Sequence, residues 1–387
     1  MGDAKARAVE AVDALEGRLR SVSREIFEHP EEKFEEVRAS KLLADELRAA
    51  GFEVDVGTAG LATAIRAIHP SAAPGPTVAI LGEYDALPEL GHACGHNLIA
   101  AGALGAALAV ASVKRDVPGR LVFLGTPAEE GGGGKVVMIE AGAFRGVDAA
   151  MMFHPASFTA VDHGSLAITE VRLEFRGVAA HASASPEKGV NALDAVIQTF
   201  NGINALRQHI RDGARIHGII TNGGAKPNIV PEYAAAEFYV RAAETSYRDE
   251  LLAKLERCAK GAALAAGATF SMSEISPPYK AMRPNRALGA AFTRNLESLG
   301  WAFDANDLPY GSTDMGDVSQ AVPAIHAYVA VCDRAIAFHS RGFAEASQSE
   351  RGHQGMLAAA KAMAMTTVDV LTSPDLVRTM QREFRGE

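Results

Sequence analysis

One short segment of the sequence brings a thiol and two imidazoles together. In Gly91-His-Ala-Cys-Gly-His-Asn97, Cys94 and His96 are separated by a single residue. Thiolates and imidazoles are ligands that zinc and neighbouring transition metals accept. Taken alone, the segment is more typical of a small buried cysteine beside hydrogen-bonded histidines. A metal site there requires further ligands from other parts of the chain.

Two adjacent carboxylates could supply both a ligand and a base. Glu129 and Glu130 follow the apolar run 120–124 and precede four glycines, 131–134, which do not support the solvated helix on which paired glutamates are usually harmless. Adjacent side chains point in different directions. One carboxylate can therefore bind a metal while its neighbour faces a water as general base, as hydrolytic zinc sites require.

Two histidines later in the chain could complete the ligand set. His154 follows the apolar run 148–153, and His339 lies in Ala337-Phe-His-Ser340. Each of them alone would more often be structural. With three earlier residues they give five nitrogen, sulfur and oxygen ligands, which exceed one structural tetrahedron and suit two metals sharing a bridging water. The five are Cys94, His96, Glu130, His154 and His339.

Asp85 is a candidate for a supporting role. It lies in Gly82-Glu-Tyr-Asp-Ala-Leu-Pro88, just after the apolar run 77–81. An Asp there could be a surface or capping residue, or it could orient a ligating imidazole, as carboxylates behind metal ligands do. The residues alone leave both interpretations open.

These residues follow predicted strands. The apolar runs 77–81, 120–124 and 148–153 are bounded by Pro and Gly, and a long Ala-, Gly- and Leu-rich helix from near Asn97 separates the first two. This alternation predicts an α/β fold. We expect a mostly parallel mixed sheet covered by helices on both faces, with functional residues at the carboxyl ends of the strands. Two helices, near 9–27 and 35–50, open the chain.

The pattern changes after Gly164. Strands and helices then follow in the order βαββαβ over about 110 residues, which predicts a self-contained inserted domain of the ferredoxin-like type at 166–276. The predicted elements are 167–175, 191–210, 215–221, 234–241, 247–266 and 268–275. The metal-binding catalytic domain then combines 1–165 with 277–387.

Composition argues against several classes of protein. The net charge of −9 and the pI near 5.8 do not suit a nucleic-acid or anionic-membrane surface. Three scattered cysteines indicate no disulfide framework, and the N-terminus shows no export signal. The longest apolar stretch, 98–113, is shorter than the ~20 residues of a membrane span. We therefore expect a cytoplasmic protein that acts on small molecules, with no nucleic-acid or membrane partner.

In these motifs the chain resembles the dinuclear metallo-aminoacylase and carboxypeptidase family of peptidase clan MH, within it the cysteine-bearing amidohydrolase branch. The resemblance runs nearly end to end. It is strongest to β-alanyl-lysine dipeptidase-like and p-aminobenzoyl-glutamate hydrolase-like members. Besides the segments 82–88 and 91–97, the motifs that carry it are Gly125-Thr-Pro-Ala-Glu-Glu130, His217-Gly-Ile-Ile220, Lys226-Pro-Asn-Ile-Val-Pro231 and Gly311-Ser-Thr-Asp314.

The resemblance implies roles for individual residues. The five ligands would hold two divalent ions per subunit, and Glu129 would be the general base. The inserted domain would be a lid and dimerisation domain, whose His181 is donated to the active site of the partner subunit in a homodimer. Asn228 and Arg241 would contact the substrate, usually its carboxylate. Gly311 and Ser312 are further substrate-binding candidates.

Two departures from the family pattern bear on the metals. Glu83 stands where many relatives carry a metal-binding His, as is usual where the Cys ligand is present, and Asn97 stands where an Asp is common in the cysteine branch. The thiolate favours softer metals, so zinc is expected first, with manganese, cobalt or nickel as alternatives.

The combined prediction is a metal-dependent amide-bond hydrolase that cleaves dipeptides or N-acyl amino acids through a metal-activated water. The alternative within the same chemistry is a p-aminobenzoyl-glutamate or auxin-conjugate amidohydrolase. A hydrolase with Cys94 as nucleophile would leave Glu129 and Glu130 unused, and a non-catalytic binding protein would retain these residues without purpose. A P-loop at 131–135 is excluded, because Glu129 and Val136 occupy the places that need Gly and Ser or Thr.

Overall fold

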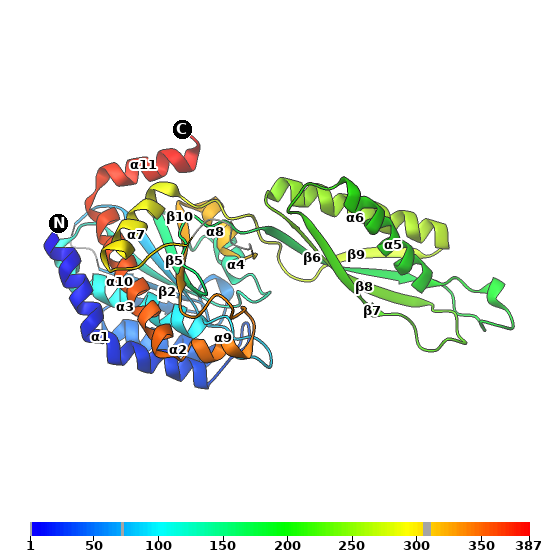
Figure 1. The fold of residues 1–387 in the computed structure, drawn as a ribbon, viewed down its shortest axis with the longest axis horizontal. Helices are drawn as coiled ribbons and strands as arrows, with labels where there is room; N and C mark the ends of the chain where they lie inside the picture. The colour runs from blue at the N-terminus through cyan, green and yellow to red at the C-terminus, as the bar shows by residue number, and fades with distance from the viewer. Residues whose placement is uncertain (1, 71–72, 305–310) are drawn as a thin grey trace. The chain divides into compact units, whose positions relative to one another are not determined.

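The structure is a computed structural model that describes residues 2–70, 73–304 and 311–387. The described chain folds into two compact units, which Figure 1 shows as ribbons. Residues 165–281 and 311–313 form the smaller unit, and the rest of the described chain forms the larger one.

The smaller unit includes two segments that the sequence assigned to the surrounding domain. Residues 277–281 belong to it because Tyr279 pairs with Ile168 and because Arg248 donates to both of their carbonyl oxygens, at 3.2 and 2.6 Å. Residues 311–313 belong to it through a hydrogen bond of 2.8 Å from the Leu166 amide to the Gly311 carbonyl.

The larger unit is built on a six-stranded sheet in the order β1-β2-β4-β3-β5-β10. Strands β4, β3, β5 and β10 are parallel, whereas β2 runs antiparallel to both β1 and β4. The mostly parallel mixed sheet is therefore confirmed. The strands are β1 (Glu53–Val56), β2 (Ile65–His69), β3 (Thr77–Glu83), β4 (Arg120–Thr126), β5 (Ala149–Ala156) and β10 (Ala324–Ala330).

Helices cover both faces of this sheet. Alternate strand residues point to opposite faces, so Val78 and Ile80 join the core beneath α1, α3, α7 and α10, whereas Ala79 and Leu81 join the core beneath α4 and α8. The helices are α1 (Gly2–Glu28), α2 (Val37–Ala49), α3 (His96–Val113), α4 (Gly134–Glu140), α7 (Arg286–Ser298), α8 (Met315–Ala321), α9 (Arg341–Ala346), α10 (Glu350–Thr372) and α11 (Pro374–Arg385).

Helix α3 is the central element of the larger unit. Over His96–Asp116 the chain is long and apolar enough to cross a membrane by length and composition alone, but 89% of its most apolar window is buried. It is therefore a core helix. Its small residues allow close packing: a Cβ at Gly102 would lie 2.5 Å from the Phe153 ring in β5.

The smaller unit is an antiparallel sheet in the order β7-β8-β6-β9, with two helices packed against it. In β6, Val171, Leu173 and Phe175 are buried against these helices, while Arg172 is exposed on the other face. The ferredoxin-like βαββαβ order is confirmed. Its elements are β6 (Ala167–Arg176), α5 (Ala192–Leu206), β7 (Arg215–Asn222), β8 (Tyr233–Ala242), α6 (Thr245–Ala266) and β9 (Thr269–Glu274).

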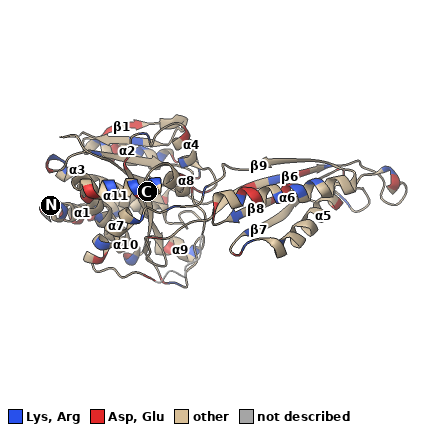
Figure 2. Ribbon diagram, turned by 90° about the horizontal axis from the view of Figure 1, so that it is seen from above, with Lys and Arg blue, Asp and Glu red and all other residues tan. Residues whose placement is uncertain are grey.

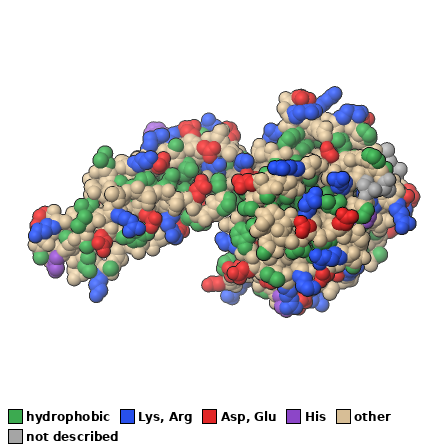
Figure 3. Space-filling view, turned by 180° about the vertical axis from the view of Figure 1, so that it is seen from behind, with side chains coloured by type: hydrophobic (Ala, Val, Ile, Leu, Met, Phe, Trp, Pro, Cys, Tyr) green, Lys and Arg blue, Asp and Glu red, His purple; other side chains and the backbone are tan. Residues whose placement is uncertain are grey.

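Charges of both signs are distributed over the surface of each unit. In Figure 2 basic and acidic residues are interspersed along the ribbon, for example in α6, where Lys254 pairs with Glu250 and Lys260 with Glu256. On the face shown in Figure 3, apolar side chains lie scattered among charged ones. Such a mixture does not produce the extended positive potential that attracts a polyanion such as a nucleic acid.

Candidate active site

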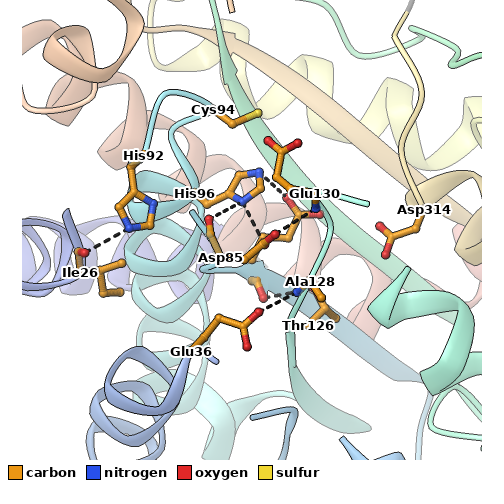
Figure 4. Close-up of polar contacts among 12 residues, drawn as sticks. Ile26, Glu36, Asp85, His92, Cys94, His96, Thr126, Ala128, Glu130 and Asp314 are labelled. Atoms are coloured by element: carbon orange, nitrogen blue, oxygen red, sulfur yellow. Dashed lines mark hydrogen bonds and ion pairs between the residues drawn. The ribbon is translucent and has the colours of Figure 1, made fainter. Parts of the chain in front are cut away.

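The five predicted metal ligands all lie in the larger unit, on segments that are far apart in the sequence. Potential ligand atoms of Cys94, His96 and His154 lie within 4.8 Å of one another, and those of Cys94, Glu130 and His339 do so as well. Figure 4 shows Cys94, His96 and Glu130 beside one another. The fold thus gathers the other four side chains around Cys94.

His96 begins α3 and is completely buried. Its Nδ1 lies 2.9 Å from the Asp85 carbonyl oxygen and 3.1 Å from the Asp85 carboxylate, both acceptors, so Nδ1 carries the hydrogen. Nε2 then presents a lone pair, and among the described residues it has no hydrogen-bond partner. A fixed tautomer with a buried lone pair is the arrangement of a metal-binding histidine.

His154 presents its Nε2 to the same place. It lies inside β5, two residues before the strand ends, rather than after the strand as the sequence suggested. Nδ1 donates to the Pro155 carbonyl at 2.7 Å, and Nε2 lies 3.4 Å from the Cys94 sulfur. Burial lowers the pKa of His154 to about 4, which keeps the imidazole neutral and able to bind a cation.

His339 reaches the cluster from a loop before α9. Its backbone has a φ of 56°, and its amide donates to the Ala93 carbonyl at 3.1 Å. The Nε2 atom lies 3.3 Å from the Glu130 carboxylate. Although burial opposes ionisation of Glu130, its hydrogen bond to His339 holds the pKa of that carboxyl below its usual range. His339 is half-exposed, so this side of the cluster faces solvent.

Asp85 supports two members of the cluster. One carboxylate oxygen accepts from His96, and the other accepts from the backbone amide of Glu130 at 2.9 Å. Of the two interpretations that the sequence left open, the surface one is wrong, because the side chain is fully buried. Asp85 therefore fixes the position of both a histidine and a carboxylate (Figure 4).

The other imidazole of the segment, His92, lies outside the cluster. Its Nε2 donates to the Ile26 carbonyl oxygen of α1 at 3.1 Å, so the side chain links the segment to the first helix. Burial lowers its pKa to about 4. His92 is a structural histidine.

Glu129 lies in the turn between β4 and α4. The preceding Ala128 has a φ of 59°, in the left-handed region, and the turn is so tight that a Cβ at Gly134 would lie 1.9 Å from the Pro127 carbonyl oxygen. A carboxylate oxygen of Glu129 and potential ligand atoms of His96 and Glu130 lie within 4.8 Å of one another. Burial, with the charges of Glu83 and Glu130, raises the pKa of Glu129 well above its usual range, which makes its carboxylate a stronger base.

A buried lysine, which the sequence analysis did not assign to the site, lies beside Glu129. Lys135 Nζ lies 2.5 Å from Glu83 and 2.7 Å from Asp314, and the Lys135 amide donates to Asp314 at 3.0 Å. All three side chains are buried. Carboxylate oxygens of Glu83, Glu129 and Asp314 lie within 4.8 Å of one another. The Lys135 ammonium is therefore the cation that compensates this group of carboxylates. The sequence signals were the Lys after four glycines and the Asp that closes the 311–314 motif.

The remaining predicted site residues lie in the smaller unit. Arg241 at the end of β8 donates from Nη1 to the Ser312 hydroxyl at 3.0 Å, and Gly311 is exposed beside Ser312. His181 and Asn228 are exposed on neighbouring segments, where the Ala182 amide donates to the Asn228 carbonyl at 3.0 Å. The structure therefore separates the predicted residues into a metal cluster in one unit and two polar groups in the other.

The donor set fits divalent metal ions. Within the cluster, two buried atoms, His96 Nε2 and Glu83 Oε2, lie 3.5 Å apart and have no hydrogen-bond partner among the described residues. Buried polar atoms are usually paired, so a concentration of such atoms at one place calls for a further partner. Imidazole, thiolate and carboxylate around one centre suit zinc and similar metals.

Comparisons with known proteins identify the family of the chain. The sequence model of peptidase family M20/M25/M40 matches residues 79–362. The chain is 42% identical to the Xaa-Arg dipeptidase of Mus musculus, covering 98% of this chain and 92% of the relative. It is 31% identical to one of the chains that form the p-aminobenzoyl-glutamate hydrolase of Escherichia coli K12, covering 97% of this chain and 94% of the relative.

Solved structures agree on the fold. A Bacillus subtilis protein described as a dinuclear metal binding peptidase from the M20 family superposes with a TM-score of 0.72 and 22% identity, covering 93% of this chain and 99% of that one. With a family match over most of its length and relatives aligned nearly end to end, the chain belongs to peptidase family M20/M25/M40 and is a metal-dependent hydrolase of amide bonds.

Proposed function

We propose that the chain is a two-metal dipeptidase that prefers dipeptides with a basic or small C-terminal residue. The observation that carries the two-metal assignment is the overlap of the ligand groups: Cys94 belongs to two of them, and the other four predicted ligands lie around it. The mouse relative, named for cleavage before arginine, supports the substrate class. The Escherichia coli relative makes p-aminobenzoyl-glutamate the second candidate.

The residues of the chain divide the chemistry among them. Bound cations would lower the pKa of a water and polarise the scissile carbonyl. Glu129 accepts the proton of the attacking water and passes it to the leaving amine. Asp85 holds His96 and the Glu130 backbone in place while this happens.

A Cys94 nucleophile is disfavoured by its surroundings. Burial, with the charge of Glu130, raises the pKa of the Cys94 thiol well above its usual value in the metal-free chain. Catalytic thiols instead have a lowered pKa. Cys94 is therefore suited to ligate a cation rather than to attack an amide.

Arg241 is the residue that we assign to binding the substrate carboxylate. Its Nε is buried without a hydrogen-bond partner among the described residues, and Ser312 binds only one of the two terminal nitrogens. A guanidinium with unused donors suits a carboxylate in bidentate contact. Gly311, Ser312 and the exposed Asn228 are the further substrate-binding residues of this proposal.

The proposal includes a homodimer in which His181 acts in the partner's site. His181 Nδ1 accepts from the amides of Ser183 and Ala184 at 3.3 and 3.2 Å, so Nε2 carries the hydrogen and can donate to an oxyanion. In the same unit β7 is an edge strand that exposes Ile219 and Ile220. An apolar edge of this kind is suited to pairing with a second copy.

Zinc is the metal proposed, because thiolate and imidazole dominate the ligand set. A reducing, cytoplasmic location is also proposed, since all three cysteines are free and Cys94 must stay reduced to bind metal.

The first experiment is metal analysis combined with turnover. We expect about two metals per chain and hydrolysis of Xaa-Arg or Xaa-Lys dipeptides that stops with a chelator and returns with zinc. Glu129→Gln should lower kcat by about 10²- to 10⁴-fold with unchanged metal content. Metal-free protein with chelator-insensitive activity would overturn the proposal, and turnover of p-aminobenzoyl-glutamate alone would replace the substrate.

The dimer is tested by mixing two inactive variants. His181→Ala and Glu129→Gln chains that exchange subunits form hybrid dimers with one intact site, so about a quarter of the wild-type activity should return. Active His181→Ala protein, or a monomer in sedimentation, contradicts this part of the proposal.

A further inference from the structure

The backbone of the proposed base is held from both sides by buried carboxylates. The amide before Glu129, that of Ala128, donates to Glu36 at 2.9 Å, and the amide after it, that of Glu130, donates to Asp85 at 2.9 Å. We propose that Glu36 is a positioning residue for catalysis, which fixes the Ala128 backbone and thereby aims the Glu129 carboxylate. This inference rests on the role of Glu129 in the proposed function.

Glu36 lies in the connection between α1 and α2, far from the metal ligands in sequence, and is completely buried. One oxygen accepts from the amides of Phe34 and Ala128, both at 2.9 Å, and the other accepts from the Thr63 hydroxyl at 2.6 Å. It makes no side-chain cap to α2, although it occupies the N-cap position. The carboxylate is therefore directed to the active-site turn rather than to its own helix (Figure 4).

Ala128 needs such an anchor. Its φ of 59° lies in the left-handed region, which an L-residue other than Gly adopts only when its surroundings impose it. Its carbonyl accepts from the Gly132 amide at 3.1 Å, so Glu36 and Gly132 hold the residue on both sides. If the Glu36 contact is lost, the backbone can relax and rotate the next side chain, Glu129, away from the attacking water.

A purely structural role for Glu36 predicts something different. Burial raises the pKa of Glu36, so the folded chain bears a cost to keep this carboxylate inside. The Thr63 hydroxyl donates to the other oxygen of the same carboxylate, in a hydrogen bond that does not involve the active-site turn. If Glu36 only stabilised the fold, loss of the Thr63 contact and loss of the Ala128 contact would have the same consequences.

The test compares Glu36→Ala, Glu36→Gln and Thr63→Val in the full chain. Glu36→Ala should lower kcat about 10- to 100-fold with unchanged KM and metal content, because a small misplacement of a catalytic group has this effect. Glu36→Gln should retain activity, since its amide oxygen can accept from Ala128 while its NH₂ group donates to Thr63. Thr63→Val should lower stability but not kcat. Ala128→Gly added to Glu36→Ala should restore part of kcat, because Gly adopts the left-handed backbone without help.

A readout that does not depend on turnover is amide hydrogen exchange of residues 126–132 in the metal-free protein. Glu36→Ala should speed exchange there, and Thr63→Val should not. If Glu36→Ala does not fold, Glu36→Asp replaces it, since it withdraws the carboxylate by about 1.5 Å and should show the same two effects.

Equal kcat losses in the Glu36 and Thr63 variants, or wild-type kcat in a folded Glu36→Ala or Glu36→Asp chain, overturn the inference. The failure is separable from that of the proposed function, because activity in Glu129→Gln would refute the base itself.

Discussion

Replacement of Lys135 by Met tests whether the buried carboxylates beside Glu129 depend on an internal cation. The Lys135 ammonium lies 2.5 Å from Glu83 and 2.7 Å from Asp314, with all three side chains buried. Met preserves the volume of the stem and removes the charge. Removal of one partner from a buried ion pair costs about 3–5 kcal/mol, because the remaining charge is left uncompensated.

The loss should depend on pH in a definite direction. Burial raises the pKa of Asp314 to about 6 even with Lys135 present, and without the ammonium it will rise further. A carboxyl whose pKa is higher in the folded than in the unfolded state binds more protons when folded, so the free energy of unfolding falls as pH rises. Near pH 4 and below both states are protonated and the penalty is small; it should grow up to about pH 8.

The assay is thermal unfolding of the chelated protein at several pH values. For a unit of this size about 3–5 kcal/mol corresponds to a Tm loss of roughly 6–20 °C. The matched control is Lys361→Met, which breaks a surface pair with Asp13 on the same unit and should cost about 0–1 kcal/mol. Equal Tm losses in the two variants, or a Lys135→Met deficit that shrinks as pH rises, would refute the reasoning.

Three further predictions concern the site. Asp85→Ala should weaken metal affinity about 10- to 100-fold, because His96 and Glu130 lose their support; competition with a fluorescent chelator measures it, and unchanged affinity removes Asp85 from this role. Cys94→Ser should shift metal preference from zinc towards manganese while some turnover remains, whereas a variant inactive with every metal would favour the thiol nucleophile. Arg241→Ala should raise KM about 10- to 100-fold through loss of charge-assisted hydrogen bonds, with metal content unchanged; an unchanged KM excludes it from substrate binding.

The fold was predictable where its elements bury a continuous apolar face. Strand β4 begins at the residue expected, and the six elements of the smaller unit lie close to their predicted ranges, because strand and helix periodicity is distinct there. Strands β1 and β2 were not predicted. They have only four and five residues, and β1 is almost entirely exposed, so the alternation in Glu53-Val-Asp-Val56 is too short to distinguish a strand.

The site was predictable as far as residue chemistry reveals it. Thiol, imidazole and carboxylate groups are typical metal ligands, so the residue types alone indicated a metal site. The structure brings the five predicted ligands together. The residue types of Lys135 and Glu36 do not by themselves indicate a role in the site. Their roles depend on contacts with Asp314 and Ala128, which are 179 and 92 residues away in the chain. Only the tertiary fold reveals partners at such separations.

The close approach at Gly102 couples the hydrophobic core to the metal centre. Gly102 lies on the helix that begins with His96, and the Phe153 ring that leaves no room for a Cβ directly precedes His154. An added methyl group must displace the Phe153 ring or move helix and strand apart, and a movement of the backbone would carry the two imidazoles with it. Metal–ligand distances in protein sites lie within about 0.2 Å of their typical values. A methyl group added at Gly102 should therefore weaken metal binding, although it touches no ligand. The packing distance between α3 and β5 thus helps to set the distance between the two ligating imidazoles.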